Sequence, residues 1–412
     1  MNTGKFVFKC TDCGQEFSSN KVEYLCPACS RDKSTITPPR GVLKVVYDYQ
    51  KIWETRKDFY EIKSNGFLDL LPVEDVSNMP PLKVGDTPLY LIKKIDDNLL
   101  PFALYLKDDS QNPTYSFKDR ASALVSAYAK ENSINTIVAA STGNAGSSLA
   151  GICASQHQKA IIMVPEKAPL AKLTQIIMYG ASIVPVRGTY DEAFDLSIKA
   201  TEEFGWYNRN TAFNPFTIEG KKTVSYEIAE QLKFSVPDRI FVPVGDGVII
   251  SGVYKGFEYL HMLDLIDRMP VIVAVQAEKS DNLVRNIGKD KFEIRPSTTI
   301  ADSISVDIPR NFYMAQKYIR QYGGETITVT DDEITRASAS LSKNTGLFAE
   351  PAAATAFAGM MEYNRQGRIE KGSSNIVLLT GSGLKDLRSV QGLLNMPEAI
   401  APSLENLKKI FS

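Results

Sequence analysis

Four of the five cysteines stand in two closely spaced pairs near the N-terminus of the 412-residue chain. Cys10 and Cys13 form one C-x2-C motif, and Cys26 and Cys29 form a second after twelve intervening residues. Each pair can place two thiolates on one turn, so that two turns together surround a zinc ion tetrahedrally. Four cysteine ligands leave no open coordination position, which predicts a structural zinc in a ribbon spanning residues 1–35. Two disulfides of a secreted domain are the alternative, and the N-terminus MNTGKFVFKC, which lacks the apolar stretch of a secretory signal, disfavours them.

Three glycine-containing turns form a second group of candidates, and each follows an apolar run of strand length. We expect each turn at the carboxyl end of a strand, where free backbone N–H groups and a helix dipole attract anions. One such turn is weak evidence, because glycine also simply ends strands, but three in one chain indicate a shared anionic ligand. The turns are Ser141-Thr142-Gly143-Asn144, Gly245-Asp246-Gly247 and Gly381-Ser382-Gly383.

The side chains usually used for acid–base chemistry are scarce. His157 and His261 are the only histidines, so a three-histidine metal site is excluded and a Ser-His-Asp triad is hard to build. We expect both at the surface, and a general base must then come from Lys, Asp, Glu or a cofactor. Cys153 lies in a helical run rich in Ala, Ser and Gly, and is expected to serve packing.

After the ribbon, apolar stretches of strand length alternate with stretches of helix length. This alternation indicates a parallel α/β sheet, and the chain length predicts two or three domains. The predicted strands cover residues 135–140, 159–165, 181–186, 239–245, 271–277, 325–330 and 374–380. The predicted helices cover residues 145–156, 172–179, 191–203, 226–233 and 332–343.

Net charge and hydropathy argue against nucleic acids and membranes as partners. The formal net charge is −1, which lacks the basic excess of a nucleic-acid-binding surface. There is no apolar run of 18 or more residues, so no membrane span is expected. A cytoplasmic enzyme acting on a small molecule follows by default.

The segment QNPTYSFKDRA at residues 111–121 points to a particular anionic ligand. Its Ser-Phe-Lys-Asp-Arg core resembles the lysine motif of fold-type-II pyridoxal-phosphate enzymes, whose lysine forms an internal aldimine, and Lys118 matches that lysine. The resemblance implies that Asn144 lies beside the cofactor's phenolic oxygen and that Thr380 faces the pyridine nitrogen. The implied loops for the substrate carboxylate and the cofactor phosphate are Ser141-Thr142-Gly143 and Gly245-Asp246-Gly247-Val248-Ile249. The ring would be the electron sink and the freed lysine amine the mobile base.

Most of the chain resembles the threonine synthase family. The resemblance implies a two-domain α/β enzyme with a tryptophan synthase β-like fold behind the zinc ribbon. The larger domain would combine residues 36–130 and 225–412, a smaller domain at 131–224 would be inserted, and the cofactor would lie between them. A homodimer is usual for the family. The segments that carry the resemblance are GVLKVVYDY (41–49), AKLTQIIMYGASIVPVRGTYDEA (171–193), NPFTIEGKKTVSYEIAEQL (214–232) and GLFAEPAAATAFAGM (346–360).

The chain departs from the family pattern where the substrate phosphate is usually held. Thr217 stands at the position of the usual arginine in the segment NPFT, and Ala212 stands where a serine is usual. Because an arginine fork is the natural clamp for a phosphate, its loss could remove most of the affinity for a dianion. Arg209, Lys221 or Lys222 could compensate, but we expect the two lysines to face solvent.

Other departures concern the immediate surroundings of the lysine motif. Tyr115 replaces a glycine and, like Asn214, is a candidate substrate contact, although plain packing explains Tyr115 equally well. Ser382 replaces a histidine, which removes a possible second base. Val248 and Ile249 stand where Gly and Asn are common, and the segments ISG (250–252) and TIADSISV (299–306) resemble threonine/serine dehydratases.

Three functions therefore compete. The first is threonine synthase activity, which forms L-threonine and phosphate from O-phospho-L-homoserine and water. The second is ammonia loss or β-replacement on an unphosphorylated small amino acid, which the missing arginine favours. The third is a catalytically inactive domain used for partner binding, and the intact set of Lys118, Asn144 and Thr380 argues against it.

Overall fold

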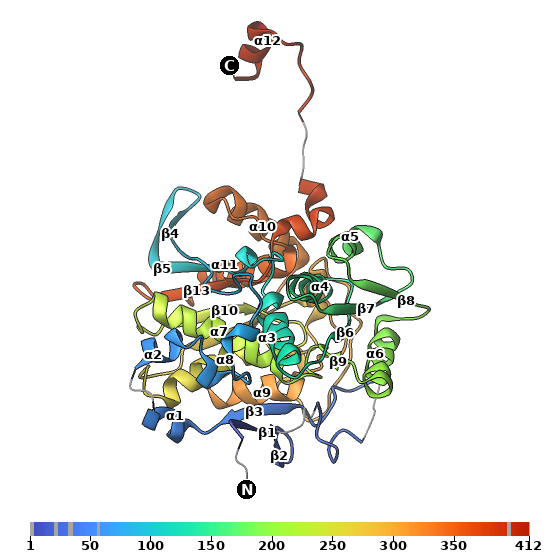
Figure 1. Ribbon diagram of the computed structural model, residues 1–412. Helices are drawn as coiled ribbons and strands as arrows, with labels where there is room; N and C mark the ends of the chain where they lie inside the picture. Colours follow the sequence, from blue (N-terminus) through green and yellow to red (C-terminus); the bar gives the residue numbers. More distant parts are fainter. Residues whose placement is uncertain (1–3, 20–23, 32–35, 56–57, 394–396, 412) are drawn as a thin grey trace.

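The computed structural model describes residues 4–19, 24–31, 36–55, 58–393 and 397–411, which build three β-sheets (Figure 1). The first is a three-stranded antiparallel sheet of order β2-β1-β3, made by β1 (Phe6–Cys10), β2 (Glu16–Ser18) and β3 (Leu43–Tyr47). Cys10 pairs with Leu43, so a strand beyond residue 35 completes the sheet that carries the first cysteine. Phe6 and Phe8 pack on Phe216, which attaches this sheet to the body of the protein.

The second sheet has six strands in the order β12-β11-β10-β13-β5-β4, and only β4 is antiparallel to its neighbour. Successive residues of its central strands point into different cores: Ile240 and Ile272 into one, Phe241 and Val273 into the other. Such burial on both faces explains the nearly continuous apolar runs of these strands. The strands are β4 (Leu89–Ile95), β5 (Asn98–Asp108), β10 (Arg239–Pro243), β11 (Val271–Ala277), β12 (Glu325–Val329) and β13 (Ser374–Leu379).

Helices cover both faces of this sheet. On one side lie α7 (Phe216–Gln231), α8 (Val248–Met262) and α9 (Phe312–Gln321), and on the other α10 (Asp331–Thr345) and α11 (Pro351–Arg365). Helices α1 (Tyr49–Thr55) and α2 (Phe59–Ser64) follow the ribbon sheet, and α12 (Leu404–Phe411) projects from the body near the C-terminus (Figure 1).

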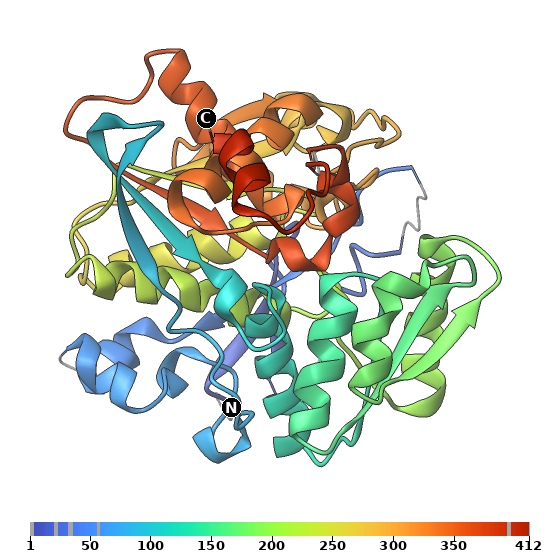
Figure 2. The ribbon, with the colours of Figure 1, turned by 90° about the horizontal axis from the view of Figure 1, so that it is seen from above.

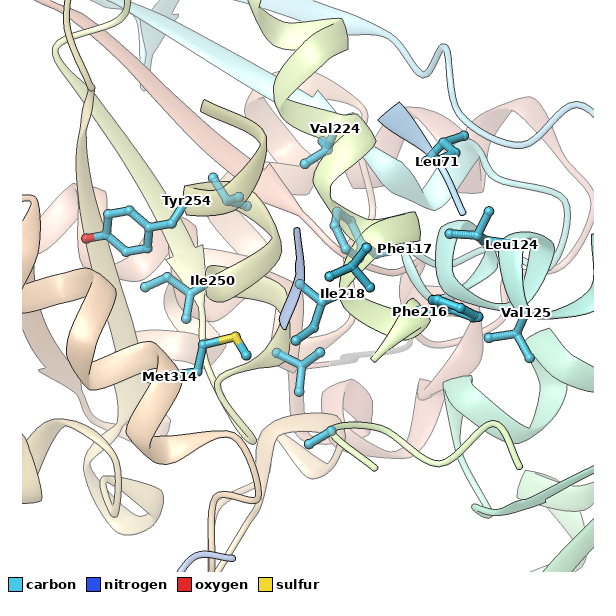
Figure 3. Packing of buried hydrophobic residues seen from close by; sticks show 14 of the residues in the cluster. Leu71, Phe117, Leu124, Val125, Phe216, Ile218, Val224, Ile250, Tyr254 and Met314 are labelled. Carbon is cyan, nitrogen blue, oxygen red and sulfur yellow. The ribbon is translucent and has the colours of Figure 1, made fainter. Parts of the chain in front are cut away.

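The third sheet is fully parallel, with the order β8-β7-β6-β9, and forms a separate block beside the larger sheet (Figure 2). Helix α3 (Lys118–Glu131) packs against both α4 and α7, so its first residue lies at the junction of the two blocks. Figure 3 shows Leu124 and Val125 of α3 beside Phe216 of α7. The block consists of β6 (Thr136–Ala140), β7 (Lys159–Pro165), β8 (Ser182–Val186) and β9 (Tyr207–Asn208), with α4 (Asn144–Ser155), α5 (Leu170–Met178) and α6 (Tyr190–Phe204).

The expected parallel α/β architecture is confirmed, and every predicted strand is present within two residues of its expected ends. The helix expected at 226–233 was placed wrongly, because α7 already begins at Phe216. Both histidines are exposed and Cys153 is buried, as expected. The domain boundaries at residues 35, 130 and 224 stay a prediction. Within the described part of the chain, no helix has the length and apolarity needed to cross a membrane.

Candidate active site and metal centre

Lys118 is the first residue of α3, and backbone pairing holds it next to the turn that follows β13. The N–H of Phe117 donates to the carbonyl of Thr380 at 2.9 Å, and the N–H of Ser382 donates to the carbonyl of Tyr115 at 3.1 Å. An isolated β-bridge joins Ser116 to the same turn. The structure therefore brings the Lys118 segment and the Thr380 turn together, as the resemblance implied.

The electrostatic surroundings of Lys118 favour a reactive amine. Burial lowers the pKa of Lys118, and the positive charge of Arg209 lowers it further, while Glu350 and Asp246 oppose the shift. A lowered pKa increases the fraction of neutral amine, which is the form that can attack a carbonyl carbon.

The two residues after Lys118 fix the start of α3. Asp119 accepts hydrogen bonds from the backbone N–H (2.6 Å) and the hydroxyl (2.5 Å) of Thr114. Arg120 makes bidentate ion pairs with two buried acids: Asp109 at 2.6 and 2.9 Å and Glu227 at 2.6 and 2.8 Å. Lys107 joins the network through Glu227 at 2.7 Å. The network connects the end of β5, the first turn of α3 and the middle of α7.

Tyr115 has a left-handed backbone with φ of 67°, which explains why glycine is usual at this position of the lysine motif. A non-glycine residue adopts this conformation at a cost. Its side chain is 53% exposed. Its proposed contact with substrate stays a prediction.

The Ser141–Asn144 turn joins β6 to α4, and Asn144 is the first residue of that helix. The Ser141 hydroxyl accepts from the N–H of Gly143 at 3.2 Å, which closes the turn. The side-chain amide of Asn144 donates to both oxygens of Glu350, at 2.8 and 3.0 Å. The helix opens with N–H groups that have no intrahelical partner, so this end of α4 can accept a carboxylate.

The second turn, residues 245–247, joins β10 to α8. Gly247 is the N-cap of α8 with φ of +83°, and a Cβ there would lie 3.0 Å from the side chains of Ala315 and Leu283. Asp246 accepts from the backbone N–H of Arg310 at 3.1 Å, so its carboxylate shapes the loop. The following residue, Val248, begins a 15-residue helix whose first N–H groups are free to bind a phosphate.

The third turn differs from expectation. Residues 383–385 form a short 3-10 helix, so β13 is not followed directly by an α-helix as expected. Lys385 instead supplies a cation there: its ammonium donates to Thr114 O (2.9 Å), Ser147 Oγ (2.9 Å) and Gln175 Oε1 (2.7 Å). Burial lowers the pKa of Lys385 to about 8. This lysine ties the turn to α4 and α5.

The expectation that Lys221 and Lys222 face solvent is wrong, because both side chains are fully buried on α7. Lys222 is neutralised by Glu219 at 2.6 Å, a residue that also pairs with Lys255. The ammonium of Lys221 has no hydrogen-bond partner within the described structure. Burial, together with the charges of Arg209 and Lys118, lowers the pKa of Lys221 well below its usual value.

Arg209 is a second buried cation without a carboxylate partner in the described residues. Its guanidinium donates to the hydroxyls of Ser122 (3.1 Å) and Thr211 (3.2 Å) and to the carbonyl of Lys118 (3.5 Å). Burial lowers its pKa to about 10. Arg209 and Lys221 therefore place two buried basic groups without carboxylate partners in the described structure near Lys118.

In the segment that usually carries the phosphate-binding arginine, the polar side chains form hydrogen bonds with neighbouring residues of the chain. Thr217 donates its hydroxyl to the carbonyl of Asn214 at 2.8 Å. Asn214 in turn donates to Asn208 O at 2.7 Å and accepts from the N–H of Phe216 at 2.8 Å. Ala212 has a positive φ of 63° and is buried. The role of Asn214 in substrate binding stays a prediction.

The four N-terminal cysteines converge. The sulfur atoms of Cys10, Cys13, Cys26 and Cys29 all lie within 4.8 Å of one another. This spacing and donor set suit a tetrahedral zinc site. The C-x2-C spacing predicted that these four thiols would come together. Cys153 lies apart from them, buried in α4.

Comparison with known proteins identifies the family. Residues 81–381 match the family of pyridoxal-phosphate dependent enzymes. The threonine synthase of Methanocaldococcus jannaschii is 34% identical over 411 residues, which is 98% of each chain. That of Methanosarcina acetivorans is 33% identical, also over 98% of each chain. The chain belongs to the threonine synthase-like family of pyridoxal-phosphate enzymes.

Solved structures show that the fold of this threonine synthase-like enzyme is shared more widely. The processed form of threonine deaminase isoform 2 from Solanum lycopersicum superimposes with a TM-score of 0.67 at 23% identity, covering 83% of this chain and 96% of that one. Maize serine racemase gives a TM-score of 0.62 at 24% identity, covering 74% and 91%. These likenesses concern the fold alone.

The residues of the site fit the cofactor of the family. Ser116 Oγ and Lys221 Nζ are buried polar atoms without a partner in the described structure, and both can satisfy a polar ligand. Sequence reasoning missed Glu350 and Lys385, which contact the predicted turns. Their only signals were that Glu350 lies in the family-like segment 346–360 and that Lys385 follows the turn of Thr380 and Ser382 closely in sequence.

We expect Arg120→Met to lower the free energy of unfolding by about 3–5 kcal/mol, because buried Asp109 loses its ion-pair partner and Glu227 keeps only Lys107. Thermal or urea unfolding measures this change. Arg368→Met removes a partly exposed arginine that stacks on Tyr363, and should cost far less.

The ion pairs of Glu227 with Arg120 and Lys107 predict that folding stability depends on pH. Burial alone would raise the pKa of Glu227, but Arg120 and Lys107 hold it down to about 2. A carboxyl with a lowered folded pKa adds stability above its unfolded pKa of about 4.3, and this stability is lost as the pH falls towards 2. Arg120→Met should flatten the decline in stability between these values. If stability declined with falling pH equally in Arg120→Met and in the wild type, Arg120 would not be the group that lowers the pKa of Glu227.

For the metal centre, we expect one zinc per chain by elemental analysis of the reduced protein. Cys26→Ser should lose the metal, whereas Cys153→Ala should keep it, because Cys153 lies outside the cluster. Metal-free protein with all four thiols reduced would show that the cluster is not a zinc site.

Proposed function

We propose that this enzyme is a threonine synthase, forming L-threonine and phosphate from O-phospho-L-homoserine and water. The observation that carries the proposal is the buried, unpartnered ammonium of Lys221, with Arg209 as a second buried cation near Lys118. These side chains can take over the phosphate-binding role of the arginine that Thr217 replaces.

The free-energy cost of burying a basic group without a partner supports this proposal. An unpaired charge is expensive to bury, and a group that lacks a partner in the free protein is satisfied when a ligand supplies one. An unphosphorylated amino acid offers one carboxylate, which the N-terminus of α4 can hold through residues 141–144. It would leave Lys221 uncompensated, whereas a substrate phosphate gives the ammonium a dianion.

The other residues receive roles in the same proposal. The cofactor supplies an electron sink when bound. Lys118 attaches it and, when released, moves protons at the substrate carbons as an amine. With the cofactor bound, Thr380 would hold the ring nitrogen, Asn144 would hold the phenolic oxygen, and residues 245–249 would hold the cofactor phosphate at the start of α8. The small and large blocks exclude water from the site when they approach each other.

The runner-up function is ammonia loss or β-replacement on an unphosphorylated amino acid. Thr217 favours it, since the usual phosphate clamp is absent and the hydroxyl is already used by Asn214. A substrate panel separates the two functions. The holoenzyme should release phosphate and threonine from O-phospho-L-homoserine and only traces of ammonia from threonine, serine or O-acetylated analogues. Formation of 2-oxobutyrate and ammonia from threonine, without phosphate release, would reject the synthase.

The role of Lys118 has a direct spectroscopic test. The purified protein should absorb in the visible range, and borohydride reduction should fix the cofactor on the peptide that contains Lys118. Lys118→Ala should lose the visible band, while Lys222→Met, which changes a lysine paired with Glu219, should keep it. Colourless wild-type protein that cannot be loaded with pyridoxal phosphate would refute this role.

Lys221→Met should have opposite effects on stability and on substrate binding. Removing a buried amine that has no hydrogen-bond partner should stabilise the substrate-free enzyme by about 1–3 kcal/mol. Losing a charged hydrogen bond to phosphate should raise KM for O-phospho-L-homoserine about tenfold or more. The matched Lys222→Met should lower the melting temperature without this change in KM, because its charge already has a partner.

Comparing Lys221→Met with Lys222→Met also identifies which phosphate Lys221 binds. Lys221 packs against Gly252 of α8, so the cofactor phosphate is the other candidate for its ammonium. A Lys221→Met enzyme that loses affinity for pyridoxal phosphate while its KM for substrate stays unchanged would assign Lys221 to the cofactor. That result would remove the main support for a phosphorylated substrate.

Phosphate binding at Lys221 should also be coupled to proton uptake. Burial lowers the pKa of this lysine in the free protein, and a bound dianion restores its charged form. Affinity for inorganic phosphate should therefore fall as the pH rises through the lowered pKa of the free state. Calorimetry at pH 8 in two buffers of different ionisation enthalpy should show uptake in the wild type and less in Lys221→Met.

A further inference from the structure

Glu350 is a buried acid at the centre of the site to which neither the sequence nor the proposed chemistry gives a role. It precedes Pro351 at the start of α11 and is 4% exposed. Its backbone N–H donates to the carbonyl of Gly381 at 3.1 Å, which fixes it against the turn after β13. A Cβ on Gly381 would lie 2.4 Å from its Oε1, so the carboxyl lies directly on this glycine.

The carboxyl of Glu350 faces polar groups but has no salt-bridge partner among the described residues. Both oxygens accept from the amide of Asn144, at 2.8 and 3.0 Å, and Ser303 lies 3.4 Å from Oε2. This contact crosses from the block of α4 to the block of α11. Because the amide nitrogen is bound by a carboxyl, its orientation is fixed, and the amide oxygen of Asn144 must point away from Glu350.

The turn after β13 holds Glu350 and the Lys118 segment close together: Gly381 accepts from the N–H of Glu350 and forms a bridge with Ser116, and Thr380 accepts from the N–H of Phe117. Charged groups from several elements act on this region. Lys118 and Lys385 stabilise the charged carboxylate, while burial and Asp386 raise the pKa of Glu350. Reciprocally, the negative charge of Glu350 favours the ammonium form of Lys118. The other charged groups that act on this lysine are Arg209, Lys221 and Asp246.

We propose that Glu350 is a further positioning residue of the active site, which orients the amide of Asn144 and places a carboxylate beside the turn that holds the Lys118 segment. It acts through Asn144 and through the effect of its charge on Lys118. A buried carboxyl near a lysine that must be neutral to react gives the enzyme control over when that lysine is reactive. The proposal rests on the proposed cofactor role of Lys118.

The test is the pH dependence of cofactor capture by the apo-protein. The rate at which the visible band grows after addition of pyridoxal phosphate depends on the fraction of neutral Lys118. Glu350→Gln keeps the shape and the hydrogen bond to Asn144 but removes the charge, so the ammonium loses its stabilisation. The midpoint of the rate–pH profile should move to lower pH by about one unit. The ionisations of pyridoxal phosphate are the same in both proteins and cancel in the comparison.

Two further variants keep the outcome interpretable. Glu350→Asp retains the charge and should return the midpoint most of the way to the wild-type value. Glu370→Gln makes the same change in net charge at an exposed residue beyond α11 and should leave the midpoint unchanged. A Glu350→Gln midpoint equal to that of the wild type, in a protein that still captures cofactor, overturns the role of Glu350 alone. Failure of the wild type itself to capture cofactor on Lys118 would instead overturn the proposed function.

Discussion

The guanidinium of Arg120 holds together the three elements on which the site depends. It joins Asp109 after β5, the first turn of α3 and Glu227 of α7 through four charged hydrogen bonds. All of these groups are almost completely removed from water, so each charge requires its partners. Lys118 lies two residues before this anchor, so the ion network fixes the backbone from which its side chain extends. Asp119 closes the same turn from the other side by binding Thr114.

Unlike Arg120, the other basic groups near Lys118 are not balanced by acidic partners among the described residues. Lys221 and Arg209 are buried without carboxylate partners in the described structure, and their pKa values are lowered as a result. Nearby, the protein does pair its buried lysines: Lys222 of α7 and Lys255 of α8 both pair with Glu219. The difference is local, because both Arg209 and Lys221 act electrostatically on Lys118. An anionic ligand completes the charge balance there, which is why we connect these cations to a phosphorylated substrate.

Some of this arrangement could be predicted from the sequence, for physical reasons. Strands such as β10 are buried on both faces and appear as continuous apolar runs, and glycine-containing turns follow β6, β10 and β13. The hairpin of β4 and β5 was missed because half of its residues are exposed and its apolar pattern is weak. The start of α7 was missed because residues 216–222 are buried all round the helix, which removes helical periodicity.

The candidate site was predicted unevenly for the same kind of reason. The lysine motif and the turns have local signatures, so Lys118, Asn144 and Thr380 could be placed together. Burial of Lys221 has no local signature, since lysines are usually exposed and its environment comes from α8 and the β10 turn. Glu350 reaches Asn144 from 206 residues away in the chain, a contact that only the tertiary structure reveals.

The central claim is that the enzyme cleaves the carbon–oxygen bond of O-phospho-L-homoserine and adds water at the neighbouring carbon. Turnover in 18O-labelled water, followed by mass spectrometry of both products, tests it most directly. The account predicts one 18O in the hydroxyl of threonine and none in the released phosphate, because the ester oxygen leaves with the phosphate. Label in the phosphate with homoserine as the other product, or no turnover of the phosphoester at all, would contradict it.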